Sequence, residues 1–354
     1  MKAVSLDIGA GTVDFLLYTD DRPIENCIKM VLPSPQRVFA TKIREITAQE
    51  SNIFIDGYTI GGGAIASAIK DHLVNGYKVY MTPSAALSLR NNLNEVRKLG
   101  VQIVEENPHR CRHLSLDEIR LSSYESMLKD FGETIKDVDI CAVSVKDHGA
   151  APEKVSNRAF RINKFQETLQ KNNNLNCFLF HENQVPEYFF RMKSAIQAAK
   201  TYLPDAEIFV MDTSISALVG CLLDKRVIGK SPALLVNVGN GHTTAVIMSE
   251  NRVLGFFEHH TSMLNTTKII ELLKRFCDGG LSHEQVFQDG GHGVIMVKKP
   301  PGFSLIDIIA VTGPKRGIME DSGIEYIYAA PGGDVMMTGT LGIVDSIKKL
   351  SRNR

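Results

Sequence analysis

The chain opens with two apolar runs separated by a short polar turn. In "AVSLDI" (3–8) and "TVDFLLY" (12–18), apolar and β-branched residues alternate with polar ones, and "GAG" lies between the two runs. This pattern predicts two antiparallel strands joined by a tight turn. We expect a β-rich stretch to follow up to about Ile55, interrupted by "LPSP" at 32–35.

Further along the chain, the spacing of apolar residues alternates between helical and strand-like. Ile65, Ile69 and Leu73 fall on one face of a helix. The other predicted elements are a helix over 82–100 capped by Thr82, a buried strand over 138–145, a helix over 184–203 that ends before Pro204, a strand over 206–214 and a helix of small residues over 215–224.

The opening hairpin is repeated later in the sequence. Residues 3–24 align without a gap on residues 233–254, 230 positions later. Both copies read apolar strand, Asp7 or Asn237, Gly-x-Gly, second apolar strand and polar turn. Two hairpins of one design predict two similar lobes that face each other.

Composition narrows the class of protein. The 354 residues are 44% hydrophobic and 23% charged, and 40 basic residues balance 40 acidic ones. This length fits two domains or one two-lobed fold, and the balanced charge argues against nucleic acid and membrane partners. Asp7 interrupts the only early apolar stretch, no run has the ~20 apolar residues of a membrane span, and the six cysteines lie far apart. We expect a cytoplasmic protein without a disulfide framework.

The repeated turn has the chemistry of a phosphate site. Successive backbone N–H groups in a Gly-x-Gly turn point toward one place, which suits an anion. Glycine is expected there for a positive φ and because a side chain would keep the phosphate away. Asp7 would then hold Mg²⁺ through water. The phosphate-binding positions are Gly9, Ala10, Gly11, Thr12, Asn237, Gly239, Asn240, Gly241, His242 and Thr243.

The glycine turns are also compatible with simpler or different roles. Ordinary hairpin chemistry, with Asp7 as a turn-capping residue, is the simplest alternative. "IGKS" at 228–231 lacks the first glycine of a Walker loop, because position 224 is Asp. Neither turn is G-x-G-x-x-G, since Asp14 and Thr244 occupy the last position. A Rossmann nucleotide site is therefore not expected.

Five motifs together resemble a known superfamily. "LDIGAGTVDFLLY" and "LVNVGNGHTTAVIM" look like the two phosphate loops of the actin, sugar-kinase and DnaK-type ATPases, called ASKHA. Residues 212–224 and 332–344 resemble the two connecting helices, with Gly339 at the close-packing position, and residues 308–319 resemble the adenosine motif. Asn237 stands where Asp is usual, which puts hydrolysis in doubt more than binding.

The resemblance implies an α/β fold with two ribonuclease H-like lobes, 1–204 and 205–354, and ATP with Mg²⁺ between them. The adenosine side would be formed by Gly313, Arg316, Gly332 and Gly333.

A closer resemblance comes from two short stretches. "VSVKDHG" (143–149) and "QDGGHG" (288–293) are similar to a set of mostly archaeal and bacterial proteins that are labelled pyruvate formate-lyase-activating enzymes. A glycyl-radical activase needs three thiolates in a C-x-x-x-C-x-x-C run to hold an iron–sulfur cluster. The sequence contains no such run, so we reject that activity.

Asp147 and His148 follow the predicted strand 138–145, where α/β folds often place catalytic groups. Asp147 is a candidate general base and His148 its partner or a phosphate donor; a loop Asp that caps the next turn is the alternative. Histidines gather later in the chain, as phosphate donors or metal ligands without a recognised metal-site spacing: His242, His259, His260, His283 and His292.

Three functions remain open from the sequence. The first is an ATPase whose lobe closure changes its affinity for a protein partner. The second is a kinase for a small acceptor with Asp147 as base. The third is a nucleotide-binding scaffold without catalysis, which Asn237 would permit.

Overall fold

The computed structural model describes residues 1–108 and 110–352. Its first sheet has the strand order β3-β2-β1-β8-β10-β9, with β1, β2 and β3 antiparallel and β8 and β10 parallel to β1. The strands of this sheet are β1 (Lys2–Ile8), β2 (Thr12–Thr19), β3 (Ile28–Pro33), β8 (Ile140–Val145), β9 (Phe180–His181) and β10 (Glu207–Asp212).

The second sheet has the same topology, with the order β14-β13-β12-β11-β15-β16. In both sheets three antiparallel strands are followed by two parallel ones, and each sheet adds one antiparallel edge strand, β9 in the first and β14 in the second. Its strands are β11 (Ala233–Val238), β12 (His242–Ser249), β13 (Arg252–His260), β14 (Gly293–Met296), β15 (Ile308–Thr312) and β16 (Ile327–Tyr328). The expected repeat is confirmed to the residue, because Asp7 pairs with Asp14 across the first hairpin and Asn237 with Thr244 across the second.

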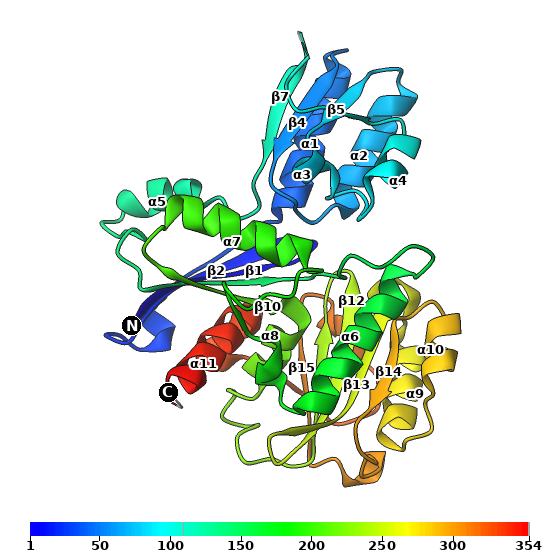
Figure 1. Ribbon diagram of the computed structural model, residues 1–354. Coiled ribbons are helices and arrows are strands. Elements are labelled where there is room, and N and C mark those ends of the chain that lie inside the picture. Colours follow the sequence, from blue (N-terminus) through cyan, green and yellow to red (C-terminus); the bar gives the residue numbers. More distant parts are fainter. Residues whose placement is uncertain (109, 353–354) are drawn as a thin grey trace.

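Helices separate and cover the two sheets. Apolar residues of both sheets form one core with helices α6 (Asn157–Lys171), α8 (Thr213–Cys221) and α11 (Thr338–Arg352). The outer face of the first sheet is covered by α5 (Leu121–Lys129) and α7 (Phe190–Tyr202), and that of the second by α9 (Thr266–Cys277) with α10 (His283–Gln288). This duplicated ribonuclease H-like arrangement is the expected ASKHA fold, with lobe one around the first sheet and lobe two around the second (Figure 1).

The two connecting helices pack as closely as their glycines allow. A Cβ at Gly220 of α8 would lie 1.9 Å from the Thr338 carbonyl oxygen, and one at Gly342 of α11 would lie 1.9 Å from the Ser216 carbonyl oxygen. A Cβ at Gly339 would lie 1.8 Å from Asp7 Oδ2. The expected close-packing role of Gly339 is confirmed, and α11 thereby reaches the first glycine turn.

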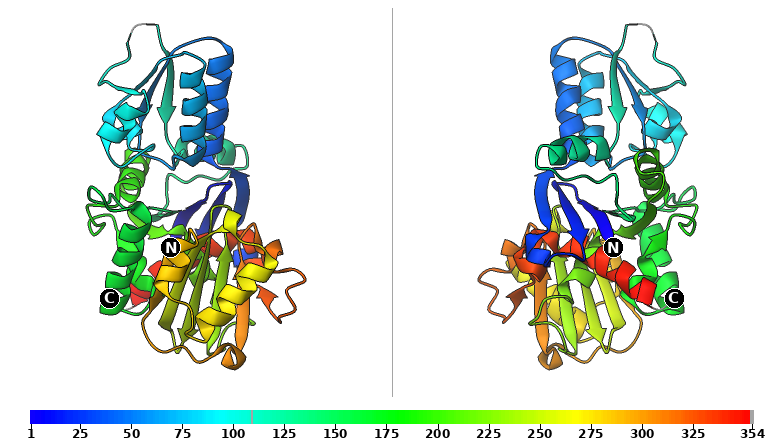
Figure 2. Two further views of the ribbon diagram at one scale, coloured as in Figure 1. Left: turned by 90° about the vertical axis from the view of Figure 1, so that its right-hand side faces the viewer. Right: turned by 90° about the vertical axis from the view of Figure 1, so that its left-hand side faces the viewer.

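A third unit is inserted into lobe one between β3 and β8. We call residues 35–116 the insert, and it stands apart from the two lobes (Figures 1 and 2). Its four strands are all parallel, in the order β6-β5-β4-β7. Its elements are α1 (Pro35–Ala48), β4 (Ile53–Gly57), α2 (Gly63–Val74), β5 (Val79–Met81), α3 (Pro83–Ala86), α4 (Leu93–Lys98), β6 (Gln102–Ile103) and β7 (Arg112–Leu116).

Two predicted elements in the insert were wrong. Residues 35–48 form helix α1 instead of β structure, because Pro35 takes the first helical position and Phe39, Ala40 and Ile43 share its buried face. Residues 82–100 form two short helices instead of one. The chain leaves the helix after Leu87, and Asn92 caps a second helix by accepting a hydrogen bond from the Asn94 N–H.

The expected boundary at 204/205 lies just before β10. Since β10 pairs with β8, the first sheet extends past that position, and the chain enters lobe two only after α8. Within the part of the chain that the structure describes, no helix is both long and apolar enough to cross a membrane.

Candidate functional site

The two glycine turns meet across the cleft between the lobes. Each turn is closed by the same hydrogen bond: Gly9 N–H donates to the Thr12 carbonyl at 2.9 Å, and Gly239 N–H to the His242 carbonyl at 3.0 Å. A Cβ at Gly11 would lie 2.3 Å from Asn240 Nδ2. The opposed arrangement predicted from the repeat is therefore present, with turn one (residues 9–12) against turn two (239–242).

The reason for the glycines differs from the expected one. None of the four turn glycines has a positive φ. The positive φ predicted for them is wrong, because the backbone keeps an ordinary strand-to-turn conformation. What requires glycine in turn one is space, since Asn240 of the opposite turn occupies the place of a side chain at Gly11.

Two cavities lie on either side of the meeting turns. The larger, of about 570 Å³, lies between turn two, the segment Lys146–Ala150 and the insert, including Gly61–Gly63 and Leu87–Asn91. The smaller, of about 70 Å³, lies between turn one and the lobe-two segment Thr312–Pro314. We call them the large and the small cavity. Gly9, Ala10, Asn237, Gly239 and Asn240 line both, so the turns form the passage between them.

The small cavity contains two neighbouring carboxylates. Asp7 and Asp14 face each other across the first hairpin, and both are buried. Burial raises the pKa of Asp7 to about 7 and, together with Asp7 itself, the pKa of Asp14 to about 8. Thr213 donates a hydrogen bond to Asp7, whereas Asp14 Oδ1 is buried without a hydrogen-bond partner among residues 1–108 and 110–352. Such a pair favours a nearby divalent cation, which would stabilise both ionised forms.

The lobe-two side of the small cavity is formed by the expected adenosine motif. Gly313 has a φ of +97°, and a Cβ there would lie 2.4 Å from the Val238 carbonyl oxygen. Arg316 donates to the Gly313 carbonyl at 3.1 Å and stacks on Tyr328 outside the cavity.

The other predicted adenosine glycines lie apart. Gly332 and Gly333 lie in a short 3₁₀ turn, and neither lines a cavity that is described here. The Gly332 carbonyl accepts a hydrogen bond from Lys29 of β3 at 2.9 Å, so this turn ties α11 to lobe one.

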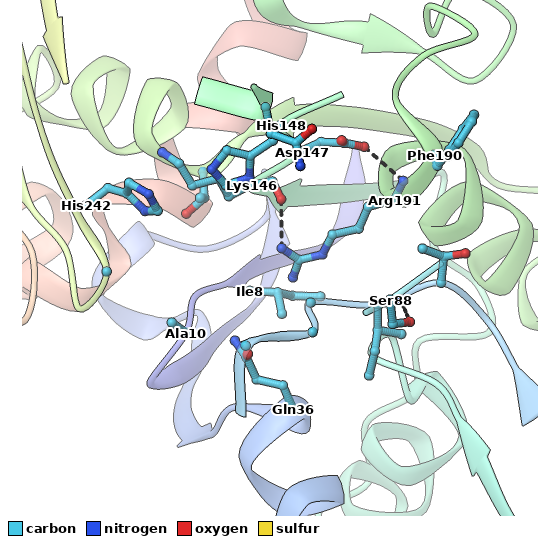
Figure 3. Close-up of a pocket in the computed structure, with 18 of the residues that line it drawn as sticks. Ile8, Ala10, Gln36, Ser88, Lys146, Asp147, His148, Phe190, Arg191 and His242 are labelled. Atoms are coloured by element: carbon cyan, nitrogen blue, oxygen red, sulfur yellow. Dashed lines mark hydrogen bonds between the residues drawn. The ribbon is translucent and has the colours of Figure 1, made fainter. Parts of the chain in front are cut away.

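Asp147 lies in the wall of the large cavity, as Figure 3 shows. Its Oδ1 accepts from the Gly149 N–H at 2.8 Å, and its Oδ2 from the N–H groups of Arg191 and Met192 at 2.9 and 3.1 Å. Burial raises its pKa, against these hydrogen bonds. The side chain therefore organises the start of α7, and a catalytic role would have to use its one remaining lone pair.

A buried network of charges connects the two lobes beneath the large cavity. Arg161 of α6 forms ion pairs with Asp212 and with Glu258 of β13, each at 2.8 Å. Lys146 pairs with the other oxygen of Glu258. Although burial acts to raise the pKa of Glu258, Arg161 and Lys146 hold it well below its usual value. Two cations and two carboxylates thus balance.

The histidines divide into two groups. His259 Nε2 contacts Asp289 at 3.0 Å and its Nδ1 contacts the His260 carbonyl at 3.1 Å, so both of its ring nitrogens have partners outside the cleft. His148, His242, His260 and His292 instead gather at the turn-two end of the large cavity, with ring centroids 4.7–5.5 Å apart for five of their pairings. Burial lowers the pKa of each of these four imidazoles.

Thr243 lies at the edge of the site. Its buried hydroxyl shares a hydrogen bond with that of Thr261, 3.0 Å away, and it lines neither cavity.

Asp212 was identified from the sequence as the acid position of the first connecting helix, but four other site residues were not: Asp14, Lys146, Arg161 and Glu258. Asp14 carried a usable signal, because it alternates with Thr12 on the strand that leaves turn one. Arg161 and Glu258 carried none, since their contact joins positions 97 residues apart.

A comparison with family models bears on this site. Residues 60–318 match the model of a family described as "Putative pyruvate format-lyase activating enzyme (DUF1786)". The chain belongs to the DUF1786 family. The match begins at the rim of the large cavity and includes turn two, the Arg161 network and the four gathered histidines. No curated protein matches the chain.

Solved structures resemble this DUF1786 protein at low identity. One is the activator of the 2-hydroxyisocaproyl-CoA dehydratase from Clostridium difficile with bound ADPNP, 10% identical, covering 100% of this chain and 98% of that one, with a TM-score of 0.38. Another is a Bacteroides thetaiotaomicron protein with an actin-like ATPase fold, 11% identical, covering 96% and 95%, with a TM-score of 0.35. A third is the ethanolamine utilization protein EutJ from Carboxydothermus hydrogenoformans, 10% identical, covering 97% and 89%, with a TM-score of 0.34.

Proposed function

We propose that this protein binds a nucleoside triphosphate with Mg²⁺ between the two glycine turns and hydrolyses it. The observation that carries the proposal is the meeting of the two turns directly beside the Asp7–Asp14 pair. Backbone N–H groups of both turns would hold the phosphates. The nucleoside would lie on the side of the small cavity, against Gly313, and the terminal phosphate would face the large cavity.

The carboxylates fit a magnesium ion. Mg²⁺ prefers oxygen ligands, retains several waters and is usually held by one or two carboxylates together with substrate phosphates. Asp7 and Asp14 supply such oxygens, and no residue that the structure describes forms a hydrogen bond with Asp14 Oδ1. When bound, the ion would neutralise charge on the phosphates; the chain itself would orient them and exclude water.

Lobe closure would connect the nucleotide to a protein partner. The turns belong to different lobes, so a triphosphate between them favours the closed arrangement. The insert contributes Gly61–Gly63 and Leu87–Asn91 to the large cavity, and it would move with this closure. The partner would then bind one state more tightly than the other.

Transfer to a small acceptor is the second candidate. It is favoured by the size of the large cavity, about 570 Å³, and by Asp147 in its wall. In this version Asp147 would accept the proton of the acceptor hydroxyl. Its three backbone hydrogen bonds would hold it in place but weaken it as a base.

One experiment separates these functions. The purified protein is incubated with γ-labelled ATP and Mg²⁺, with and without small-molecule cell extract, and the label is followed. Release of free phosphate in both samples supports hydrolysis, whereas a labelled metabolite formed only with extract supports transfer. If ATP binds without either product, the chain is a nucleotide-binding scaffold, and if ATP with Mg²⁺ gives no thermal shift, the turns are not a nucleotide site.

A further inference from the structure

Three histidines from separate segments converge where the large cavity meets turn two. His148 follows β8 in lobe one, His242 ends turn two, and His292 precedes β14. One ring nitrogen of each can be chosen so that all three lie within 4.8 Å of one another. Figure 3 shows His148 and His242 together at the same end of the cavity, away from Ser88 and Phe190.

Ring nitrogens of two of these histidines have no hydrogen-bond partner within the described part of the chain. His292 is fully buried, and its Nε2 has no hydrogen-bond partner among the described residues. Nε2 of His242 is also buried without a described partner. A buried polar atom without a partner costs free energy, so a bound ligand at this point would be stabilised by both.

Glu258 contacts both the imidazole ring and the backbone of His292. Its Oε2 lies 3.3 Å from His292 Nδ1, an ion-pair distance without hydrogen-bond geometry among the described residues, and its carbonyl accepts from the His292 N–H at 2.9 Å. A carboxylate beside one ring nitrogen of a histidine raises the basicity of the other nitrogen, as is usual for metal-binding histidines.

The motif "DGGHG" explains how His292 reaches this place. A Cβ at Gly291 would lie 2.6 Å from both Val286 Cγ1 and His259 Cδ2, and one at Gly293 would lie 2.2 Å from His283 Nδ1. Only glycine fits on either side, so the imidazole of His292 is the one side chain that this turn directs inward.

The neighbouring cations do not prevent a metal ion from binding. Lys146 and Arg161 are nearby, but both are paired with Glu258, and Arg161 is paired with Asp212 as well. The network is neutral in sum, so the point between the imidazoles is not a strongly positive one.

We propose that His148, His242 and His292 bind one divalent transition-metal ion, with zinc as the best fit. Three imidazoles without a thiolate suit zinc and its neighbours rather than Mg²⁺. A tetrahedral zinc ion needs ligand nitrogens about 3.4 Å apart, so the rings would draw together from their present separation. The fourth position faces the large cavity, where a water or a phosphoryl oxygen would occupy it.

This ion would bridge the lobes. His148 belongs to lobe one, and His242 and His292 belong to lobe two. The site is distinct from the Asp7–Asp14 pair, which lines only the small cavity. Because metal binding can be measured without nucleotide, the inference and the proposed function stand or fall separately.

The test is a titration of chelator-treated protein with Co²⁺ alone and with Zn²⁺ alone, followed by calorimetry and by the visible spectrum of bound Co²⁺. We expect one ion per chain and a tetrahedral Co²⁺ spectrum that Zn²⁺ abolishes. His292→Gln and His242→Gln should weaken binding at least tenfold, and Glu258→Gln roughly 10–100-fold. His259→Gln is the matched control, because its ring has other partners, and it should bind as the parent does.

Two further variants guard against misinterpretation. His148→Gln and His242→Gln change the two half-buried ligands, so they are the variants to use where His292→Gln, at the buried ligand, does not fold. Asp14→Asn should leave the Co²⁺ spectrum unchanged. The inference is overturned if folded His148→Gln and His242→Gln bind Co²⁺ like the parent, or if His259→Gln weakens binding equally. It is also overturned if inorganic phosphate stabilises the metal-free protein and Zn²⁺ does not, since the imidazoles then form an anion site.

Discussion

The two glycine turns have the same backbone arrangement, but the side chains around them differ in their chemistry. Both are closed by the same N–H to carbonyl bond, and their strands pair in the same register. Around turn one the side chains are carboxylates, Asp7 and Asp14, whereas the equivalent positions around turn two are Asn237 and Thr244. The duplicated hairpin thus keeps its shape while the charge is confined to one copy. A cation that needs oxygen ligands has a place only on the side of turn one.

The largest effect is expected from crowding the carboxylate of turn one. In Gly339→Ala, the new Cβ would lie 1.8 Å from Asp7 Oδ2, so one of the two groups would have to shift. We expect the free energy of unfolding to fall by about 3 kcal/mol, the upper range for overpacking. Chemical denaturation measures this change. Gly317→Ala in lobe two has ordinary space at 3.5 Å and serves as the control. Equal losses in both variants would mean that the contact with Asp7 is not what Gly339 provides.

Removing a charge beside turn one should weaken nucleotide binding more than a change beside turn two does. Asp7→Asn is expected to weaken Mg²⁺-dependent ATP binding roughly 10–100-fold, as for other groups that hold a metal through its shell. Asn237→Ala should weaken it less than tenfold, because an amide carries no charge. Calorimetry at fixed Mg²⁺ gives both values. If the two variants lose the same affinity, the division of roles between the turns is wrong.

The charge of turn one should also make stability depend on pH. The pKa of Asp14 is raised to about 8 in the folded protein, so between about pH 4 and pH 8 the folded state holds a proton that the unfolded state has released. Stability should therefore be full below pH 4 and fall as the pH rises toward 8. Asp14→Asn should remove part of this slope and stabilise the metal-free protein at pH 8 by about 1–2 kcal/mol.

Thermal unfolding from pH 5 to pH 8 measures this effect, with added Mg²⁺ as a second arm. Mg²⁺ should flatten the slope in the parent protein and do little in Asp14→Asn. A parent whose stability rises over this range, without any change in the variant, would contradict the assignment.

The smallest effect is expected where the turns touch. Gly11→Ala pushes against Asn240, a flexible side chain, so we expect a loss of less than about 1 kcal/mol in ATP binding. Gly280→Ala lies away from both turns, has ordinary space at 3.9 Å and should be neutral. Adding Asn240→Ala to Gly11→Ala should restore affinity, and a double variant that binds no better than the single one would show that the turns do not meet in solution.

Local patterns in the sequence predicted the parts of the fold that depend on neighbouring residues. The alternation of apolar and polar residues predicts the two hairpins. The ungapped repeat predicts that they are equivalent, so their strands are expected to pair in the same register, as they do. The close packing of α8 and α11 followed from their small residues. The pattern does not indicate the insert, because "LPSP" reads as a break in a β-rich stretch, whereas Pro35 in fact begins helix α1.

The site was predictable only where it lies on the turns. Asp7 and the glycines stand in a motif, but the Arg161–Glu258 pair and the gathering of His148, His242 and His292 depend on which strands become neighbours. Those neighbours are set by the crossover of the whole chain from one sheet to the other. The sequence lists these residues, but it does not show which of them become neighbours in the folded chain.

The contact between α8 and α11 limits how the two lobes can move relative to each other. Since backbone atoms of each helix fill the space where the other would carry a side chain, at Gly220 and Gly342, the two axes can neither approach nor be spread by a larger residue without loss of the fold. Relative motion of the lobes is then reduced to pivoting about this point. Because the spacing at this contact is fixed, a small rotation of one helix against the other would produce a large separation of the lobes at the cleft rim beside the insert.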